Sequence, residues 1–386
     1  MVIRQEAERR PTDVATKERR PPHKILVISD THFGEGDAIL AADPQEAERA
    51  NARIDGLMAW LADEGPFREI ILLGDIWELW SANFQAAREA SELFLSQLGQ
   101  LPFERMIFLP GNHDHHLLVQ HQLVEQIMAL RGDREIEVPA YTQRSFNDSY
   151  LARLFPPDVG PRFTVSYPDH FATVADRQII FHHGHHAGVL QGRSVFSSGP
   201  LFILRRLENI GLADISRSDL ELASTIIFEF MYAASLGEQT RTKLNRFWDN
   251  FLRAKRILMA AQFVLLAPLR LFLNRTTRGT TSQDVERFAG AIERLLAMMA
   301  AERHAPVPCD AYIFGHTHRA GIVRHSHPDR ARPMLLVNSG SWLHEPAKRN
   351  RASEGTFLII DEHSVTLYRQ NLDLSIRPLD IEPWPA

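Results

Sequence analysis

Seven short apolar runs, each followed at once by a few polar residues, constrain the fold of this 386-residue chain more than any other feature. The runs are near-continuous in Ile, Leu, Val and Phe, which is typical of strands covered on both faces of a sheet. They are KILVISD from Lys24, REIILLGD (68–75), RMIFLPGN (105–112), QIIFHHGH (178–185), DAYIFGH (310–316), PMLLVNSGS (333–341) and TFLIID (356–361).

Helical stretches separate the early strands, which predicts an α/β fold: a layered βαβ sheet sandwich flanked by helices. The two stretches are Pro44–Glu64 and Asn83–Gln100, both rich in Ala, Glu and Leu. The C-terminal end, from about residue 333, is strand-rich and should add antiparallel structure. Between the fourth and fifth strands the pattern changes to helices alone, expected near 199–210, 217–236, 239–274 and 282–302.

These patterns predict one catalytic domain with a large insertion. We expect a disordered polar tail at 1–22, a catalytic domain made of 23–186 and 304–386, and a helical insertion or lid at 187–303. The tail has no apolar core and is not a signal peptide. A single cysteine, Cys309, cannot close an internal disulfide, which favours a reducing, cytoplasmic location. We expect its side chain to be a buried small hydrophobe.

The charge balance argues against nucleic acid as a partner. Lys and Arg number 43 and Asp and Glu number 48, a formal net charge of −5, so no global basic field is expected. Hydrophobic residues make up 44% of the chain and charged residues 24%, as in ordinary soluble proteins. Intrinsic disorder and disulfide miniproteins are thereby excluded. The 18 histidines are the unusual number, and many of them follow the predicted strands.

Histidine, aspartate and asparagine recur where the predicted strands end. The groups are Asp30-Thr-His32, Gly74-Asp75, Gly111-Asn112-His113-Asp114, His182-His183-Gly184-His185-His186 and Gly315-His316-Thr317-His318. The carboxyl ends of strands in an open α/β sheet converge at one edge, so these side chains should form one cluster. Residues two apart in extended chain point to the same side, so each Asp-x-His or His-x-His pair can present two ligands.

The ligand types in this cluster suit borderline divalent cations. Imidazole and carboxylate together favour Mn, Fe or Zn over Ca, which prefers oxygen alone. Asp75 ends a buried strand, where an unpaired carboxylate is costly, and a position between two cations would remove that cost.

The set D-x-H, G-D, G-N-H-D, H-G-H and G-H-T-H, across residues 30–318, resembles the calcineurin-like metallophosphoesterase superfamily. The resemblance implies one metal on Asp30, His32, Asp75 and His318, and a second on Asp75, Asn112, His183 and His316. It also implies two divalent ions, Mn before Fe or Zn, and a metal-bridging hydroxide that attacks phosphorus. Catalytic roles fall to Asn112, which would hold phosphoryl oxygens, to His113 as the leaving-group acid, and to Glu78, which could orient His113.

Within that superfamily, the chain is similar to UDP-2,3-diacylglucosamine pyrophosphatases. The likeness lies in GDIWELW (Gly74–Trp80), in the helical insertion, and in a V-N-x-G-S-W segment at Val337–Trp342. It departs from them at His113, where those enzymes typically carry Arg. The substrate would therefore be a phosphorylated small molecule or a lipid- or nucleotide-linked phosphoester or pyrophosphate. Two alternatives stay open: a phosphodiesterase or nuclease of the same superfamily, and a non-catalytic binding scaffold on this fold.

Other residues carry weaker expectations. Residues 241–279 hold nine Lys and Arg against one Asp around the apolar run 257–273, which suits either a lid helix or the surface of an anionic membrane. Three arginines soon after the fourth motif are candidates to meet substrate phosphate: Arg193, Arg205 and Arg206. Of the remaining histidines, we expect solvated or rim positions for His115, His116 and His121, and supporting or merely adjacent positions for His182, His185 and His186.

Overall fold

The structure is a computed structural model, and it describes residues 23–41, 47–131, 144–147, 150–192, 195–207, 210–211, 214–237, 242–243, 281–328, 330, 332–344 and 353–385. Three expectations from the sequence fall outside these residues: the tail at 1–22, the helix at 239–274 except for two residues, and nearly all of 241–279.

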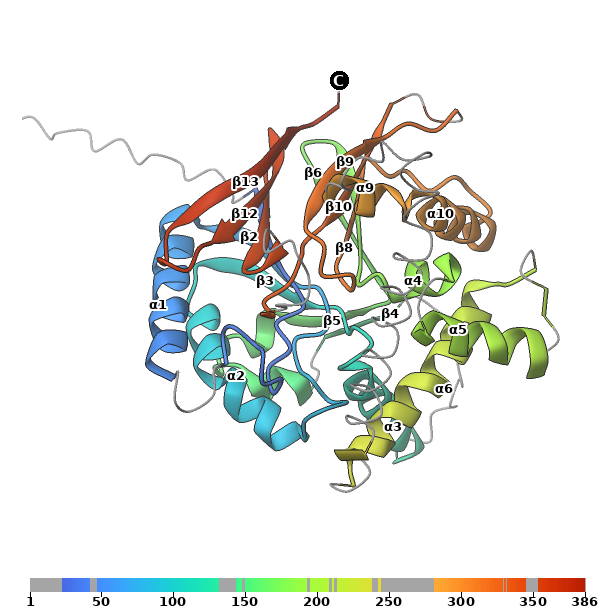
Figure 1. The fold of residues 1–386 in the computed structure, drawn as a ribbon, viewed down its shortest axis with the longest axis horizontal. Helices are drawn as coiled ribbons and strands as arrows, with labels where there is room; N and C mark the ends of the chain where they lie inside the picture. Colours follow the sequence, from blue (N-terminus) through green and yellow to red (C-terminus); the bar gives the residue numbers. More distant parts are fainter. Residues whose placement is uncertain are drawn as a thin grey trace, which may run out of the picture.

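Two β-sheets confirm the predicted α/β sandwich (Figure 1). The first has eight strands in the order β13-β12-β11-β1-β2-β3-β5-β4. The second has five, in the order β6-β7-β8-β10-β9. In the first sheet the bounds are β1 Lys24–Ile28, β2 Phe67–Leu72, β3 Phe103–Phe108, β4 Arg144–Asn147, β5 Phe163–Tyr167, β11 Thr356–Ile360, β12 Ser364–Gln370 and β13 Ile376–Pro383. In the second they are β6 Asp169–Val174, β7 Arg177–His182, β8 Ala311–Phe314, β9 Gly321–His325 and β10 Met334–Asn338.

Helices cover the outer faces of both sheets. Their bounds are α1 Ala47–Glu64, α2 Phe84–Gly99, α3 His115–Arg131, α4 His185–Gln191, α5 Val195–Phe202, α6 Arg217–Ser235, α9 Thr281–Glu286 and α10 Ala289–Arg303, with short 3-10 turns at Tyr150–Leu154 and Gly160–Arg162 and a π-turn at Ile203–Leu207. Local sequence fixes the start of α6: the Ser216 hydroxyl accepts from the Asp219 N–H while the Asp219 carboxylate accepts from the Ser216 N–H.

The alternation of side chains along β1 explains the layering. Ile25 and Val27 point into an apolar core between the two sheets, whereas Leu26 and Ile28 point into a second core beneath α1 and α2. A third core lies between the outer face of the second sheet and helices α4, α6 and α10. Because both faces of the central strands are buried, their sequences are largely apolar, as the sequence pattern predicted.

All seven apolar runs are strands, and the C-terminal strands β11, β12 and β13 pair antiparallel as expected. Their neighbour β10 instead pairs parallel with β8 and antiparallel with β9. The helix expected at 199–210 is shorter, because it ends at Phe202 and continues as the π-turn, and the one at 282–302 is two helices, α9 and α10. Six further strands have less apolar sequences that gave no clear signal: β4, β5, β6, β9, β12 and β13.

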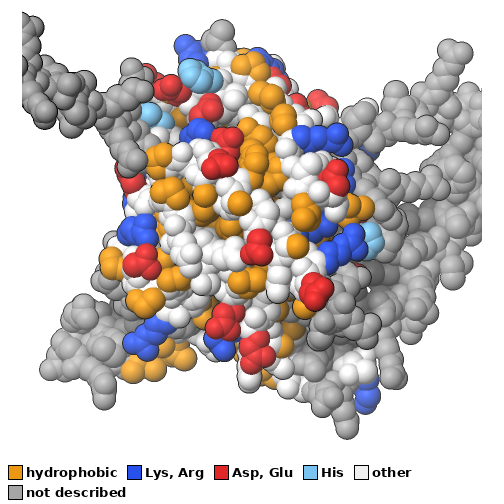
Figure 2. Space-filling model, turned by 90° about the vertical axis from the view of Figure 1, so that its left-hand side faces the viewer, with side chains coloured by type: hydrophobic (Ala, Val, Ile, Leu, Met, Phe, Trp, Pro, Cys, Tyr) orange, Lys and Arg blue, Asp and Glu red, His pale blue; other side chains and the backbone are white. Residues whose placement is uncertain are grey.

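The described part of 187–303 is helical and contains no strand. We propose that 187–303 is an insertion into a catalytic domain made of 23–186 and 304–386. No helix among the described residues is long and apolar enough to cross a membrane. Figure 2, a view from the left-hand side of Figure 1, shows acidic, basic and apolar side chains interspersed over that face, without a field of one sign among its described residues.

Candidate functional site

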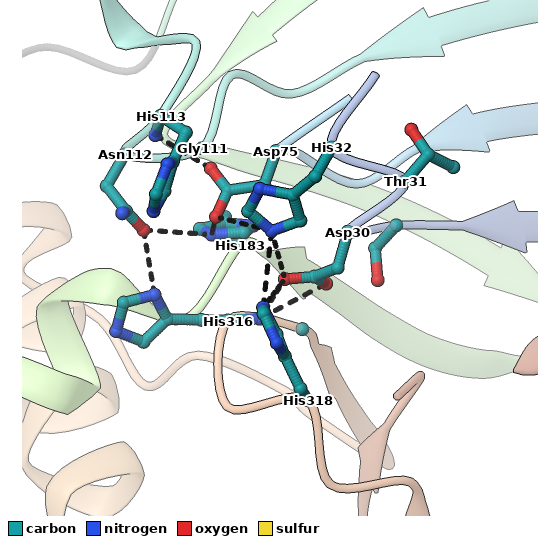
Figure 3. Close-up of polar contacts among 12 residues, drawn as sticks. Asp30, Thr31, His32, Asp75, Gly111, Asn112, His113, His183, His316 and His318 are labelled. Carbon is teal, nitrogen blue, oxygen red and sulfur yellow. Dashed lines mark hydrogen bonds and ion pairs between the residues drawn. The ribbon is translucent and has the colours of Figure 1, made fainter. Parts of the chain in front are cut away.

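Five strands from both sheets end at one edge of the sandwich and place the predicted metal ligands around a common centre (Figure 3). Strands β1, β2 and β3 are parallel neighbours in the first sheet, and β7 and β8 in the second. Their carboxyl ends therefore lie close together. The structure brings together all seven candidates: Asp30, His32, Asp75, Asn112, His183, His316 and His318.

Asp30, His32 and His318 form the first group of candidate ligands. The Nε2 atom of His318 lies 3.3 Å from Oδ1 of Asp30 and 3.2 Å from Nε2 of His32. The Nδ1 atom of His32 is 3.0 Å from the carboxylate of Glu78, which accepts the Nδ1 proton and leaves Nε2 facing the group. One carboxylate oxygen and two ring nitrogens thus meet at one point, a set of atoms that could hold a cation.

Asp75, Asn112, His183 and His316 form the second group. The Nε2 atom of His183 lies 3.1 Å from Oδ2 of Asp75 and 3.1 Å from Oδ1 of Asn112, and that amide oxygen is 2.7 Å from Nδ1 of His316. Asp75 also reaches toward the first group, with Oδ2 at 3.8 Å from Nε2 of His32. One carboxylate oxygen therefore faces both groups of ligands.

The electrostatics of the second group fit a bound cation. His183 donates from Nδ1 to the carbonyl of Leu73 at 2.9 Å, so its Nε2 faces Asp75. Burial lowers the pKa of His183, but Asp75 raises it to about 9, so a proton occupies this position in the metal-free chain. Burial alone would raise the pKa of Asp75, and the imidazoles of His183 and His113 hold it well below its usual range. A divalent ion would displace that proton, so its affinity should fall as pH falls.

Five of the candidate ligand residues have left-handed backbone angles, which direct their side chains toward the centre. Their φ angles are 52° at Asp30, 46° at His32, 53° at Asp75, 66° at His316 and 55° at His318. Such residues cost about 1–3 kcal/mol each outside glycine and concentrate at functional sites. The expectation that the i, i+2 pairs lie in extended chain is therefore wrong. The pairs converge because each loop turns sharply after its strand, held for example by the Asp30 N–H on the Gly74 carbonyl at 3.0 Å.

Two glycines permit the carboxylates to approach the neighbouring backbone. A Cβ atom on Gly111 would lie 2.3 Å from Oδ1 of Asp75, and one on Gly315 would lie 2.3 Å from Oδ2 of Asp30. In the space these glycines leave, the N–H of His113 donates to Asp75 at 2.8 Å and the N–H of His316 donates to Asp30 at 3.0 Å. The glycines in the G-N-H-D and G-H-T-H groups are thus required by close approach.

Glu78 supports two histidines with one carboxylate oxygen. Its Oε2 lies 3.0 Å from Nδ1 of His32 and 2.7 Å from Nδ1 of His113, while Oε1 accepts the N–H groups of Trp80 and Ser81. Burial would raise the pKa of Glu78, but His113 and these hydrogen bonds hold it far below its usual range. The expected contact with His113 is present, and the one with His32 was missed because it joins different strands.

His113 lies at the open side of the cluster. Its ring stacks on Trp80 with centroids 4.0 Å apart and meets His32 edge-on at 4.7 Å. Burial opposes its charged form, but Glu78 and Asp75 outweigh that effect and raise the pKa of His113 to about 10. With 24% of its side chain exposed, His113 holds a proton that a bound molecule can reach.

Asp114 is a supporting residue that sequence reasoning missed. It is fully buried and accepts the Gly111 N–H at 2.6 Å and the Ile76 N–H at 2.8 Å. Burial, together with the nearby Asp75, raises the pKa of Asp114 to about 6. It ties the loop after β3 to the loop after β2. Asp114 is the last residue of the G-N-H-D motif, and its presence there was a signal for a supporting role, since an Asp side chain in a loop commonly accepts hydrogen bonds from nearby backbone N–H groups.

The other histidines differ from expectation in part. His115 and His121 are buried, with 2% and 1% exposed, so the prediction of solvated or rim positions is wrong for them. His116 is partly exposed and stacks on Tyr232 at 3.4 Å. His182, His185 and His186 lie buried beside the candidate ligand His183, in agreement with the expected supporting or adjacent positions. Cys309 is buried as expected, and burial raises the pKa of its thiol.

A pocket of about 230 Å³ opens beside the cluster. Its lining combines polar site residues with an apolar wall from Trp80 and from helices α4 and α6: Asp75, Trp80, Asn112, His113, His185, Gly188, Val189, Phe228, His316 and His318. Of the three candidate arginines, Arg205 is exposed and is not among the lining residues. Arg193 and the side chain of Arg206 lie outside the described residues.

Comparison with known proteins gives one family. The sequence profile of the calcineurin-like phosphoesterase family matches residues 23–222. No curated protein matches the chain. Among solved structures, it is similar to a predicted phosphoesterase from Streptococcus pneumoniae, at 11% identity and a TM-score of 0.31, with 94% of this chain and 98% of that chain covered.

Two further solved structures are similar. A dimetal phosphatase from Danio rerio has 11% identity and a TM-score of 0.38, with 90% of this chain and 96% of that chain covered. A cold-active protein-tyrosine phosphatase from a psychrophilic Shewanella species has 13% identity and a TM-score of 0.32, with 93% of this chain and 81% of that chain covered.

Proposed function

We propose that this chain, which belongs to the calcineurin-like phosphoesterase family and is a metal-dependent phosphoester hydrolase, works with two divalent ions held on either side of Asp75. One observation carries the proposal: Oδ2 of Asp75 lies 3.1 Å from Nε2 of His183 and 3.8 Å from Nε2 of His32, so it faces both groups of ligands. When bound, the ions would polarise the phosphoryl oxygens and acidify the attacking water. Manganese is the proposed metal, with iron or zinc as substitutes.

The protein groups around that centre divide the remaining tasks. Asn112 presents its amide to the pocket and would orient a phosphoryl oxygen. His113, kept protonated by Glu78, would donate its proton to the leaving oxygen. Trp80 fixes the plane of the His113 ring by stacking, which keeps the proton donor in position. We also propose that Arg193, Arg205 and Arg206 contact the outer phosphate of a longer substrate.

The substrate proposed is a phosphoester or pyrophosphate with an apolar part beside the phosphorus. Phe228, Val189 and Trp80 form the apolar wall of the pocket of about 230 Å³, next to its polar site residues. Similarity to UDP-2,3-diacylglucosamine pyrophosphatases rests on GDIWELW and on Val337–Trp342, and favours the pyrophosphate bond.

A comparison of substrates tests this function. We would incubate manganese-loaded protein with a phosphomonoester, a phosphodiester and a nucleoside-diphosphate sugar, and measure products by phosphorus NMR. Metal-dependent cleavage confined to the pyrophosphate supports a function like that of the UDP-2,3-diacylglucosamine pyrophosphatases. Cleavage of the diester would instead favour a phosphodiesterase or nuclease. If loaded protein cleaves none of the three, a binding scaffold becomes the better description.

We also propose that the insertion contacts an anionic membrane. On α6, Leu222, Ile226 and Phe230 are exposed at 53%, 46% and 63%, and their spacing of four places them on one face of the helix. The cationic stretch 241–279 follows in the sequence. An apolar helix face next to basic residues is suited to a surface of anionic lipid.

Vesicle flotation checks this contact. The full chain should float with vesicles that contain phosphatidylserine and remain in solution with phosphatidylcholine alone. Each basic residue near an anionic surface contributes about 1 kcal/mol, so replacing those at 243, 246, 253, 255 and 256 by Gln should abolish flotation. Phe230→Ser should weaken it. Flotation that is unchanged by both variants would contradict the contact and leave the apolar face without this role.

A further inference from the structure

A chain of buried hydrogen bonds joins helix α6 to the loop that carries His183. It starts at Glu221 on α6 and passes through two histidines to the backbone of Gly184. The His186 Nε2 atom lies 3.1 Å from Oε2 of Glu221, and the His186 Nδ1 atom lies 3.2 Å from Nε2 of His182. The Gly184 N–H then donates to Nδ1 of His182 at 2.8 Å.

The backbone donor at one end fixes every proton position in this chain. Because Gly184 donates to Nδ1 of His182, the proton of that ring is on Nε2 and is donated to His186. His186 therefore accepts at Nδ1 and carries its own proton on Nε2. That proton needs an acceptor, and the carboxylate of Glu221 supplies it.

The carboxylate of Glu221 has hydrogen-bond partners on both of its oxygens. The Tyr167 hydroxyl donates to the same Oε2 at 2.7 Å, while His115 Nε2 and the Thr225 hydroxyl lie 3.2 Å from Oε1. Side chains from four elements, α3, β5, α4 and α6, therefore converge on the carboxylate of Glu221, whose side chain is 19% exposed. A buried imidazole N–H without such a partner costs about 1–3 kcal/mol.

The far end of the hydrogen-bond chain is the turn that places a candidate metal ligand. Gly184 directly follows His183 and has a φ angle of +118°, in the region that only glycine adopts readily. A Cβ there would lie 3.1 Å from Cβ of His316, another candidate ligand. The orientation of the Gly184 peptide thus sets the direction in which His183 leaves β7.

We propose that Glu221 is a positioning residue for the metal centre: by fixing the tautomers of His186 and His182, it holds the Gly184 turn and so the His183 imidazole. The proposal rests on the metal centre of the proposed function. It also gives the insertion a role in that centre, since α6 carries both Glu221 and the pocket residue Phe228.

Three variants of the full-length protein test the proposal by calorimetric titration of the chelator-treated chain with Mn²⁺. Glu221→Leu removes the acceptor at similar volume, and Mn²⁺ affinity should fall about 10–100-fold, the usual effect of losing a group that orients a ligating histidine. Glu221→Gln keeps one oxygen for His186 and Tyr167, so it should restore most of the affinity. Glu229→Leu is the matched control on the same helix, because Glu229 pairs with His116 at 2.6 Å and lies outside the chain to Gly184.

The thermal midpoint of each metal-free variant separates positioning from folding. A purely structural role predicts that Glu221→Leu and Glu229→Leu lower the midpoint and leave Mn²⁺ affinity unchanged, and this result would overturn the proposal. If the wild-type chain itself binds no Mn²⁺, the proposed function fails, whereas binding that Glu221→Leu leaves intact defeats the positioning role alone.

Nitrogen NMR of the wild-type histidines provides a test without any variant, which matters if Glu221→Leu does not fold. Both His182 and His186 should show an unprotonated Nδ1 and a protonated Nε2. The opposite tautomer in either ring contradicts the chain of hydrogen bonds and overturns the proposal.

Discussion

Asp75→Asn should lower turnover of any substrate of this protein by about 10³-fold or more and should prevent full occupancy by divalent ions. Metal ions contribute several kcal/mol to phosphoryl transfer, and each loss of about 1.4 kcal/mol is tenfold in rate. Asp75 faces both groups of candidate ligands, so one substitution should affect both proposed metal sites. Elemental analysis of the dialysed protein and the steady-state rate at saturating Mn²⁺ measure the two effects.

The metal-free Asp75→Asn protein should fold normally. In the wild type, Oδ1 accepts the His113 N–H and Oδ2 faces His183. An amide in that position can still accept from the His113 backbone and donate to Nε2 of His183, so no buried polar group loses its partner. Asp63→Asn, on the exposed side of α1, is the control that should change neither metal content nor rate. A fully active Asp75→Asn enzyme would refute the metal assignment.

His113→Ala should lower turnover by about 10²–10⁴-fold, the usual contribution of general acid catalysis, while both ions remain bound. The reduction should be largest for esters with a poor leaving group, such as an alkyl phosphate, and much smaller for a nitrophenyl ester, whose leaving oxygen needs no proton. Stacking on Trp80 and contact with Glu78 hold His113 at the pocket, so its loss removes the proton donor without disturbing the ligands.

The dependence on the leaving group decides what His113 does. An equal reduction for both esters would assign His113 to stabilising charge on the phosphoryl oxygens, and no reduction for either would remove it from the mechanism. His116→Ala is the control, since that ring stacks on Tyr232 and pairs with Glu229, outside the pocket. It should leave the rate unchanged.

Most of the candidate site could be predicted from the sequence because its members follow apolar strands. Asp30, Asp75, Asn112, His183 and His316 each stand a few residues after such a run, and parallel strands end at the same edge of a sheet. The strand pattern itself was equally readable, since burial on both faces leaves little but Ile, Leu, Val and Phe. The partly buried strand β12 and the largely exposed edge strand β13 gave no comparable signal.

Contacts between elements far apart in the chain could not be predicted. Asp114 ties the loop after β3 to the loop after β2, and Glu221 on α6 contacts His186, three residues after the candidate ligand His183. The place of Asp114 at the end of G-N-H-D marks it as a candidate, but does not show which backbone groups it contacts. Nothing in the neighbouring sequence marks Glu221, because a Glu on a helix is ordinarily solvated. His115 and His121 were assigned to the surface for the same reason, although the fold buries them.

The sequence by itself thus determined the α/β layering and the identity of the candidate ligands, because burial and strand ends leave a local pattern. Only the tertiary structure decided how those ligands are aimed. Left-handed turns after the strands replace the extended pairs, and Glu78 and Glu221 fix the histidine rings through hydrogen bonds. The physical reason is that hydrogen bonds between side chains act over about 3 Å. They therefore depend on which segments meet in space, whereas hydrophobic periodicity depends only on neighbours along the chain.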